Sequence, residues 1–204
     1  LNKNYFADCR EVLKTIPDKS INLFLEDMPY NTTACDWDYE VDLKEYWELR
    51  LPKLADNGVF VLTASQPFAT DLIISNRKMF KYEMIWQKSI PSNFMQVNRM
   101  PLKYHENILV FFNNPSTYNK VYIFEREDSG KERYKYKINS DRTQSEQYYI
   151  ERNKTKYDIE KKNPMSVVKI NNETRNNGCI HPTQKPIELF SYFIKTYTNE
   201  NDIV

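Results

Sequence analysis

The fold of this chain is decided by the stretch Ile21-Asn22-Leu23-Phe24-Leu25-Glu26-Asp27-Met28-Pro29-Tyr30. Its first five residues are mostly apolar and predict a buried strand. Its last four supply a carboxylate, a rigid turn and an aromatic ring at the end of that strand, which in open α/β sheets is the edge where ligands bind. The stretch therefore predicts a site for a planar group with an exocyclic amine. The purely structural alternative is that Asp27 caps a helix and Tyr30 is a core residue after an ordinary strand.

Outward from this stretch, strands are predicted to alternate with helices. Strands are expected at residues 59–62, 82–86 and 107–112, and helices at 11–14, 43–54, 68–75 and after 183. A short strand is expected at Tyr5-Phe6, and Asn57-Gly58 is expected to end the helix over 43–54. Thr183 is the expected N-cap of the last helix, whose buried face would carry Ile187, Phe190, Ile194 and Tyr197. This alternation predicts an α/β fold with a mainly parallel sheet.

Composition limits the class of protein further. The 204 residues suffice for one α/β core with an insertion, and the net charge of +1 does not mark a strongly basic nucleic-acid binder. No apolar run approaches about 18 residues, so no membrane span is expected. The three scattered cysteines fit a reducing cytoplasm better than a disulfide framework. Neither histidine has a cysteine at zinc spacing, so no metal site is expected.

Three segments together resemble the β group of DNA amino-methyltransferases, and phage and prophage members in particular. Those enzymes make N6-methyladenine or N4-methylcytosine with S-adenosylmethionine as methyl donor. The segments are Phe6-Ala7-Asp8-Cys9-Arg10-Glu11-Val12-Leu13, Asp27-Met28-Pro29-Tyr30-Asn31-Thr32-Thr33-Ala34-Cys35-Asp36-Trp37-Asp38 and His181-Pro182-Thr183-Gln184-Lys185-Pro186. The resemblance covers almost the whole chain. It implies a Rossmann-like, S-adenosylmethionine-dependent methyltransferase sheet.

The resemblance also assigns catalytic roles to the Asp27-Met28-Pro29-Tyr30 tetrapeptide. An adenine N6 amine is a poor nucleophile, because its lone pair is delocalised into the ring. The Asp27 carboxylate and the Met28 carbonyl would accept its hydrogens and direct it toward the methyl group, and the carboxylate would stabilise the developing positive charge. Tyr30 would stack on a base flipped out of the duplex, and Pro29 would fix the turn.

Further residues are assigned to the cofactor and to DNA by the same resemblance. Asp8 and the Cys9 backbone would lie at the adenine of S-adenosylmethionine, although Asp8 is equally well explained as a turn or cap residue. The methionine end would be held by His181, Thr183, Gln184 and Lys185, where a helix N-terminus suits a carboxylate. A polar loop would bring three residues to the DNA side: Asn93, Phe94 and Arg99. An ordinary surface loop explains those three equally well.

The residue composition divides the chain into three parts: a catalytic core at 1–112, an insertion at 113–178 and a return to the core at 179–204. The insertion has 14 Lys or Arg against 10 Asp or Glu, and it contains seven tyrosines. A solvated, partly disordered insertion is the bland interpretation. A target-recognition region is favoured by its position in the resembling family, because cations bind phosphates and aromatic rings stack on bases.

The chain departs from the family pattern at three places. Met28 stands where Pro is commoner, which a backbone role tolerates, and Asn31 stands where Gly is usual, which Asn's tolerance of positive φ allows. The cofactor signature Phe-x-Gly-x-Gly is missing, since the three glycines are far apart and the chain stops at Val204. The chain is thus expected to be most of a catalytic domain, incomplete at the C-terminus. Without the cofactor loop, weak binding of S-adenosylmethionine is expected. The missing strand would leave an unpaired edge beside residues 23–25, so aggregation or the need for a partner is also expected.

The leading hypothesis is therefore a site-specific adenine-N6 DNA methyltransferase. Cytosine-N4 methylation is the nearest rival, a catalytically inactive DNA-binding remnant is a second, and methylation of RNA or of a protein glutamine is a third. Double-stranded DNA is the expected partner. A second copy of the chain, in a homodimer, and a cognate restriction endonuclease are further possible partners.

Overall fold

The computed structural model describes residues 3–33, 35–121, 163–173, 181 and 183–204. Residues 1–121 and 165–204 form one compact unit, and every helix and strand described below belongs to it. Residues 122–164 form a second unit that lies almost entirely outside the described residues, as do six of the seven tyrosines of the predicted insertion. The first unit includes 113–121 and 165–173 from the range predicted as the insertion.

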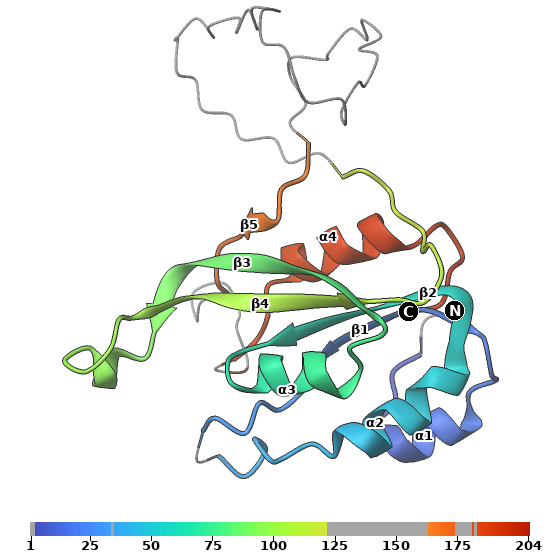
Figure 1. The fold of residues 1–204 in the computed structure, drawn as a ribbon, viewed down its shortest axis with the longest axis horizontal. Coiled ribbons are helices and arrows are strands. Elements are labelled where there is room, and N and C mark those ends of the chain that lie inside the picture. The colour runs from blue at the N-terminus through green and yellow to red at the C-terminus, as the bar shows by residue number, and fades with distance from the viewer. Residues whose placement is uncertain (1–2, 34, 122–162, 174–180, 182) are drawn as a thin grey trace, which may run out of the picture. The chain divides into compact units, whose positions relative to one another are not determined.

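Four α-helices, two 3₁₀ turns and five strands make up the described fold (Figure 1). The helices are α1 (Cys9–Thr15), α2 (Leu43–Arg50), α3 (Phe68–Ser75) and α4 (Ile187–Tyr197). The 3₁₀ turns are η1 (Leu51–Lys53) and η2 (Phe94–Gln96). The strands are β1 (Ile21–Asp27), β2 (Leu54–Ala64), β3 (Phe80–Ser92), β4 (Lys103–Phe111) and β5 (Val167–Lys169). The predicted α/β class is confirmed, and so is the buried strand that ends at Asp27.

The five strands form one sheet in the order β1-β2-β4-β3-β5. β1 pairs with β2 and β3 with β5 in parallel, whereas β4 pairs antiparallel with both β2 and β3. β1, β2, β3 and β5 therefore all run in the same direction, and the prediction of a mainly parallel sheet is confirmed. β4 is the exception among the described strands, because its short connection to β3 is a hairpin and cannot contain the crossover that a parallel pair needs.

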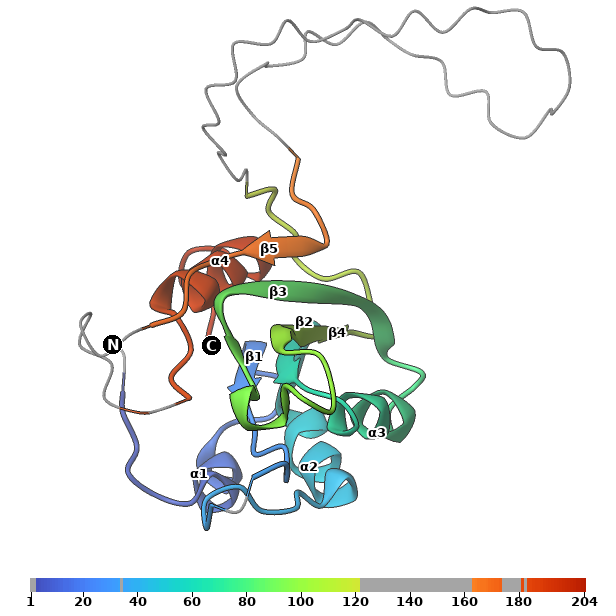
Figure 2. The ribbon, with the colours of Figure 1, turned by 90° about the vertical axis from the view of Figure 1, so that its left-hand side faces the viewer.

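Helices cover both faces of the sheet, as Figures 1 and 2 show: α2 and α3 lie on one side and α4 on the other. On the first side, Phe24 of β1 stacks on Phe60 of β2 with ring centroids 4.8 Å apart, and Trp47 of α2 packs edge-on against Phe60 at 5.1 Å. Side chains alternate along a strand, so Leu23 points to the α4 side, where it is fully buried. Both faces of the central strands are thus buried, and the polar residues that follow β1 are left at its carboxyl end.

Two local predictions at the first half of the chain are wrong. Tyr5-Phe6 is not a strand, and both rings are exposed. Asn57-Gly58 does not end a helix but lies inside β2, because α2 already ends at Arg50 and the 3₁₀ turn η1 that follows ends at Lys53. The register of β1 against β2 shifts between Ile21 and Leu23, which accommodates the extra residues of β2.

The predicted buried face of the last helix is also wrong, except at Tyr197. α4 begins after Pro186, and Thr183 does not cap it. Ile187 is 72% exposed and Ile194 is 38% exposed, while the buried residues are Leu189, Tyr192, Phe193, Thr196 and Tyr197. Apolar residues surround most of this helix, so sequence periodicity alone does not select the face that packs.

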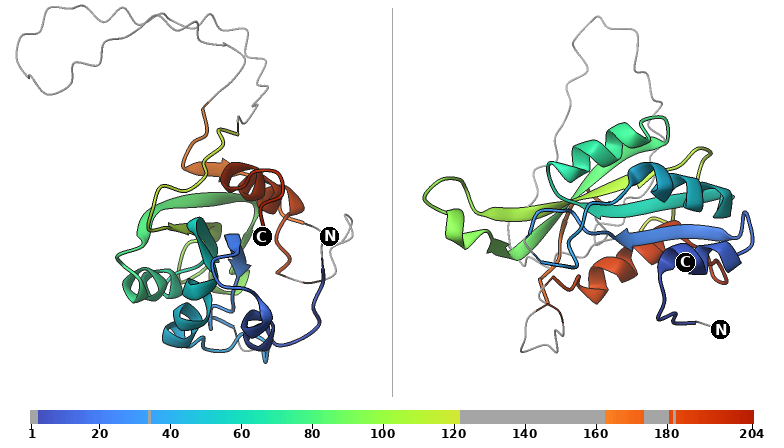
Figure 3. Two further views of the ribbon diagram at one scale, coloured as in Figure 1. Left: turned by 90° about the vertical axis from the view of Figure 1, so that its right-hand side faces the viewer. Right: turned by 90° about the horizontal axis from the view of Figure 1, so that it is seen from below.

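The last residues of the chain lie beside β1, the edge strand. The Ile203 carbonyl accepts hydrogen bonds from the backbone N–H groups of Asn22 at 2.9 Å and Leu23 at 3.2 Å. Figure 3 shows this end of the chain next to β1 in two further views.

Candidate active site at the carboxyl end of strand β1

A single buried carboxylate organises the loop that follows β1. Asp38, 6% exposed, accepts backbone N–H bonds at Oδ1 from Tyr30 (2.8 Å) and Asn31 (2.7 Å). Its Oδ2 accepts two more, from Thr32 (2.9 Å) and Thr33 (2.6 Å). Burial opposes ionisation, but these hydrogen bonds outweigh it and lower the pKa of Asp38 below its usual value. The backbone of residues 30–33 is thereby held in place by the Asp38 carboxylate.

Asn31 has a φ of 52°, in the left-handed region. This conformation is costly for most side chains but accessible to Asn. The prediction that Asn31 takes the place of Gly in a turn is confirmed.

Asp27, the last residue of β1, faces this loop with a side chain that is 31% exposed. Its Oδ1 accepts from the Tyr30 hydroxyl at 2.8 Å and the Thr63 hydroxyl at 2.5 Å, and it lies 3.0 Å from the Lys185 ammonium. Among the described residues, none donates to Oδ2. One oxygen of the carboxylate is therefore fixed from three sides, and the other is available to a ligand.

Tyr30 presents one ring face to the interior of the protein. The ring stacks on Phe68, with centroids 5.8 Å apart and planes 25° from parallel. The Lys185 ammonium lies 5.4 Å from the Tyr30 centroid. Burial raises the pKa of Tyr30 well above its usual value, and the adjacent Asp27 charge adds to the increase. The phenol therefore stays protonated and remains a donor to Asp27.

A cavity of about 640 Å³, here called the Lys185 cavity, opens on one side of Asp27. Its lining contains a buried chain of charges. The Lys185 ammonium bridges Asp27 and Glu106, at 3.0 and 3.1 Å, and the Lys88 ammonium lies 3.1 Å from the other oxygen of Glu106. Lys103 donates to Ser65. Burial lowers the pKa of Lys103, and its lysine neighbours contribute to the decrease.

The structure brings the predicted His181 segment into this same cavity. His181, Thr183, Gln184 and Lys185 all line it, together with Asp27 and Tyr30. The His181 ring packs edge-on against Trp37 at 5.3 Å, and the Thr183 hydroxyl lies 3.0 Å from His181 Nδ1. Residues from the two ends of the chain thus meet at the end of β1.

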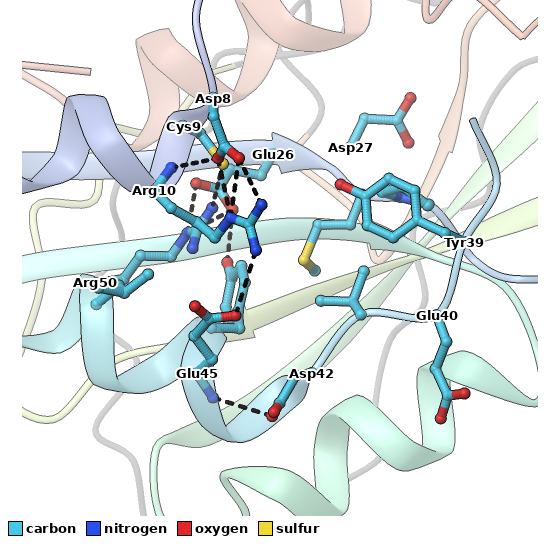
Figure 4. Close-up of a pocket in the computed structure, with 15 residues that line it drawn as sticks. Asp8, Cys9, Arg10, Glu26, Asp27, Tyr39, Glu40, Asp42, Glu45 and Arg50 are labelled. Carbon is cyan, nitrogen blue, oxygen red and sulfur yellow. Dashed lines mark hydrogen bonds and ion pairs between the residues drawn. The ribbon is translucent and has the colours of Figure 1, made fainter. Parts of the chain in front are cut away.

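A second cavity of about 670 Å³, here called the Asp8 cavity, lies on the other side of β1 (Figure 4). Asp8 caps α1 by accepting from the Arg10 backbone N–H at 2.9 Å, and the Arg10 guanidinium, 2.5 Å away, lowers the pKa of Asp8 to about 2. The cap interpretation of Asp8 is thus confirmed. Its side chain is still 43% exposed, and the predicted Cys9 lines the same cavity.

A buried ion pair closes the floor of the Asp8 cavity. The Arg50 Nε lies 2.9 and 3.0 Å from the two oxygens of Glu26, and the Tyr46 hydroxyl donates to Glu26 at 2.7 Å. The Arg50 guanidinium also stacks over the Tyr46 ring at 4.0 Å. Asp27, Met28 and Pro29 line both cavities, so the predicted tetrapeptide separates two ligand-sized spaces.

A family model described as DNA methylase matches residues 21–204, which include this entire arrangement except the Asp8 segment. The chain belongs to the DNA methylase family. These enzymes methylate the exocyclic amine of adenine at N6 or of cytosine at N4, with S-adenosylmethionine as methyl donor. The resemblance inferred from the sequence is thereby confirmed.

Solved structures with the same fold include two DNA methyltransferases. The complex of M1.HpyAVI with SAM matches with a TM-score of 0.58 at 19% identity, covering 97% of this chain and 78% of the other. The cytosine-N4-specific PvuII DNA methyltransferase matches with a TM-score of 0.59 at 16% identity, covering 97% and 71%. At these identities the likeness shows the fold, which is the Rossmann-like methyltransferase fold. A search among curated proteins finds no match.

Sequence reasoning missed three charged residues of this methylase site: Asp38, Lys88 and Glu106. Asp38 lay inside the quoted family segment but had no role assigned. Glu106 carried a weak signal, because it lies two residues before the apolar run of β4, which begins at Ile108. Lys88 carried none, since its partner is 18 residues away on the neighbouring strand.

None of the three residues predicted to face DNA lines either cavity. Asn93, Phe94 and Arg99 belong to the connection between β3 and β4, where η2 forms the tip. Asn93 has a φ of 73°, and Phe94 is 58% exposed. No described helix is long and apolar enough to span a bilayer. Within the described residues, no three Cys, His, Asp or Glu side chains gather as metal ligands would.

Proposed function

We propose that this methylase modifies the N6 amine of an adenine that has been flipped out of duplex DNA. The observation that supports it most directly is the state of Asp27, which lines both cavities: Oδ1 is held by three donors, while no described residue donates to Oδ2. A carboxylate oriented in this way accepts one hydrogen of an exocyclic amine. The Met28 carbonyl is the proposed acceptor of the second.

Tyr30 is the proposed stacking partner of the flipped base. Its ring lines the Lys185 cavity and is supported from behind by Phe68. The lost stacking inside the duplex costs a few kcal/mol, which an aromatic surface offsets in part. Pro29 fixes the backbone between the acceptor and the ring. The chain would thus orient both the amine and the plane of the base.

Asp27 also has an electrostatic role in this proposal. Positive charge develops on the amine nitrogen as it is alkylated, and a carboxylate beside it stabilises that charge. Lys185 holds Oδ1 from the opposite side at 3.0 Å, so the carboxylate does not rotate away. Lys185 is in turn held by Glu106. The orientation of Asp27 is therefore set before the substrate enters.

The residues around the Asp8 cavity fit S-adenosylmethionine. Four carboxylates, Asp8, Glu40, Asp42 and Glu45, can accept from its hydroxyl and amino groups, while Met28, Val41 and Leu49 supply apolar contacts. We propose that Asp8 and the Cys9 backbone lie beside its adenine in the Asp8 cavity. Its methionine end is proposed to lie toward the Lys185 cavity, which shares Asp27, Met28 and Pro29 with the first and is lined by His181, Thr183, Gln184 and Lys185. Bound there, the cofactor supplies an electrophilic methyl group.

The surface that meets DNA is proposed to include Asn93, Phe94 and Arg99, with 113–178 as the target-recognition region between the catalytic segments 1–112 and 179–204. The tip position of the first three supports this assignment, since they extend from the strands whose other residues line the Lys185 cavity. Arg99 supplies a cation for phosphate.

The test is methylation of DNA with labelled S-adenosylmethionine, followed by mass spectrometry of the nucleosides. N6-methyladenine is expected, and N4-methylcytosine would refute the adenine assignment but not the family. An Asp27→Ala variant should lose activity by about two to three orders of magnitude, as when one oriented electrostatic group is removed. Asp36→Ala, which removes an exposed carboxylate nearby, is the matched control.

A further inference from the structure

The hairpin between β3 and β4 carries an unusual group of exposed apolar side chains. Met95 is fully exposed at 101%, Phe94 is 58% exposed, and Val97 is 54% exposed. Met100 (47%) and Ile90 (46%) flank them. Large apolar side chains clustered at one protruding point mark an interaction surface more often than isolated ones do. We call Phe94, Met95 and Val97 the hairpin tip.

The hairpin tip is held in a defined shape by its own backbone. Gln96 N–H donates to the Asn93 carbonyl at 3.0 Å, Arg99 N–H donates to the Gln96 carbonyl at 2.8 Å, and Met100 N–H donates to the same carbonyl at 3.0 Å. The left-handed Asn93 starts this turn. The apolar side chains are therefore presented by an ordered turn at the end of two long strands, which extends beyond the rest of the sheet (Figures 1 and 3).

The charge of the hairpin indicates the chemical class of partner that it binds. Between Glu83 and Glu106 the chain contains no Asp or Glu. Arg99 is the exposed cation of this hairpin, and Lys103 is partly exposed at its base, whereas Lys88 is buried against Glu106. A cationic segment attracts a polyanion, whereas two copies of it repel each other. Apolar side chains such as Met and Phe, carried on a cationic element, are the means by which proteins enter a base stack. Duplex DNA is therefore the occupant that fits, rather than a second copy of the chain.

The hairpin also adjoins the proposed base pocket. Ile90, Pro91 and Ser92 at the end of β3, and Lys103 at the start of β4, line the Lys185 cavity. The hairpin tip begins two residues after Ser92. A duplex whose target base enters the cavity thus brings the neighbouring base pairs to the tip.

We propose that the hairpin tip is a wedge, in which Met95 and Phe94 enter the duplex beside the target and occupy the space that the flipped base leaves. This inference rests on the proposed function and deepens it. The wedge acts on base flipping and not on methyl transfer, because it replaces the stacking that the departing base had supplied. Its contribution should therefore depend on whether the target is paired.

The experiment compares two duplexes that share the recognition sequence mapped by the methylation assay, with 2-aminopurine in place of the target base. In one duplex the target is paired, and in the other it faces an abasic site. Fluorescence reports flipping as the full protein is added, and radiolabelled methyl transfer to matched duplexes with the natural base is followed in parallel. The variants are Met95→Ala, the double variant Phe94→Ala/Met95→Ala, and Ile74→Ala as control, since Ile74 is 69% exposed on α3.

The double variant should flip the paired target about ten- to a hundredfold less well, the value of about one stacked base. On the duplex with the abasic site the loss should fall below about threefold, because little stacking remains to be replaced. Equal losses on both duplexes, or none on either, would overturn the wedge while leaving the methylase proposal intact. A wild-type protein that neither flips nor methylates any duplex would overturn both. A change in oligomeric state on sedimentation of the double variant would instead assign the tip to a second copy.

Discussion

Replacing Asp38 by Asn should loosen the loop that carries Tyr30 and weaken the whole fold. The wild-type carboxylate accepts four backbone N–H bonds, two at each oxygen. Asn keeps one oxygen and puts an NH₂ group where the other stood. Two of the four N–H groups then face a donor, and the charge is lost as well.

The magnitude follows from these four contacts. A hydrogen bond to a charged group contributes about 1.5–3 kcal/mol, so two lost bonds would reduce the free energy of unfolding by about 3–6 kcal/mol. Because the loop lies at the surface, its N–H groups regain water when it opens. The lower end, about 3 kcal/mol, is therefore expected, and this is a large fraction of the stability of a typical domain.

The effect of Asp38→Asn should also depend on pH. The pKa of Asp38 is lowered in the folded state from 3.8, so its contribution is fully present above about pH 4. It is lost as the pH falls through the lowered folded pKa, where the folded state takes up the proton. The difference in stability between wild type and variant should therefore shrink on acidification below about pH 4.

Urea denaturation from pH 7 to pH 3 measures this difference, and hydrogen exchange of the amides of residues 30–33 locates it. Asp36→Asn is the control, because Asp36 is an exposed carboxylate two residues away. The reasoning fails if Asp38→Asn leaves both the unfolding midpoint and the protection of these four amides unchanged at pH 7.

Three other substitutions test separate parts of the structure. Leu189→Ala should destabilise the fold by about 2–5 kcal/mol in thermal or urea unfolding, because it leaves a cavity under α4, whereas Ile187→Ala should change stability by less than about 0.5 kcal/mol; equal effects would contradict the packing of this helix. Glu26→Gln should cost about 3 kcal/mol in urea unfolding, since it leaves the buried Arg50 guanidinium without its counter-charge, and Arg50→Lys, which keeps the charge but not the paired geometry, should cost less. Tyr30→Phe should keep the proposed base stacking but remove a donor to Asp27, the proposed catalytic carboxylate, so methyl transfer in single turnover should fall about tenfold with unchanged DNA affinity; a loss of affinity alone would refute that division of roles.

Much of the site could be predicted because its chemistry is concentrated in short segments. Asp27 and Tyr30 were expected together at one edge of a sheet, and the structure places them there in a shared hydrogen bond. Asn31 was expected in a left-handed turn and has that conformation. Each of these expectations depends on the preference of a few consecutive residues, which the rest of the fold does not alter.

Other parts of the site could not be predicted, because they depend on residues that are distant in the chain. Glu106 binds lysines from two different segments, and its neighbours in the sequence do not indicate either one. Asp38 is one of several acids in its segment, and only the folded loop shows which of them collects the N–H groups.

The sequence by itself determined that strand β1 is buried, that it ends in a carboxylate and an aromatic ring, and that the fold is α/β, while three family segments gave the resemblance to DNA methylases. Periodicity and turn preferences are local, so they are contained in the residues themselves. Only the tertiary structure decided the antiparallel place of β4 in the sheet, the buried face of α4, and the chain of charges that fixes Asp27. Those features depend on which surfaces meet when distant segments pack, and local backbone preferences do not specify that choice.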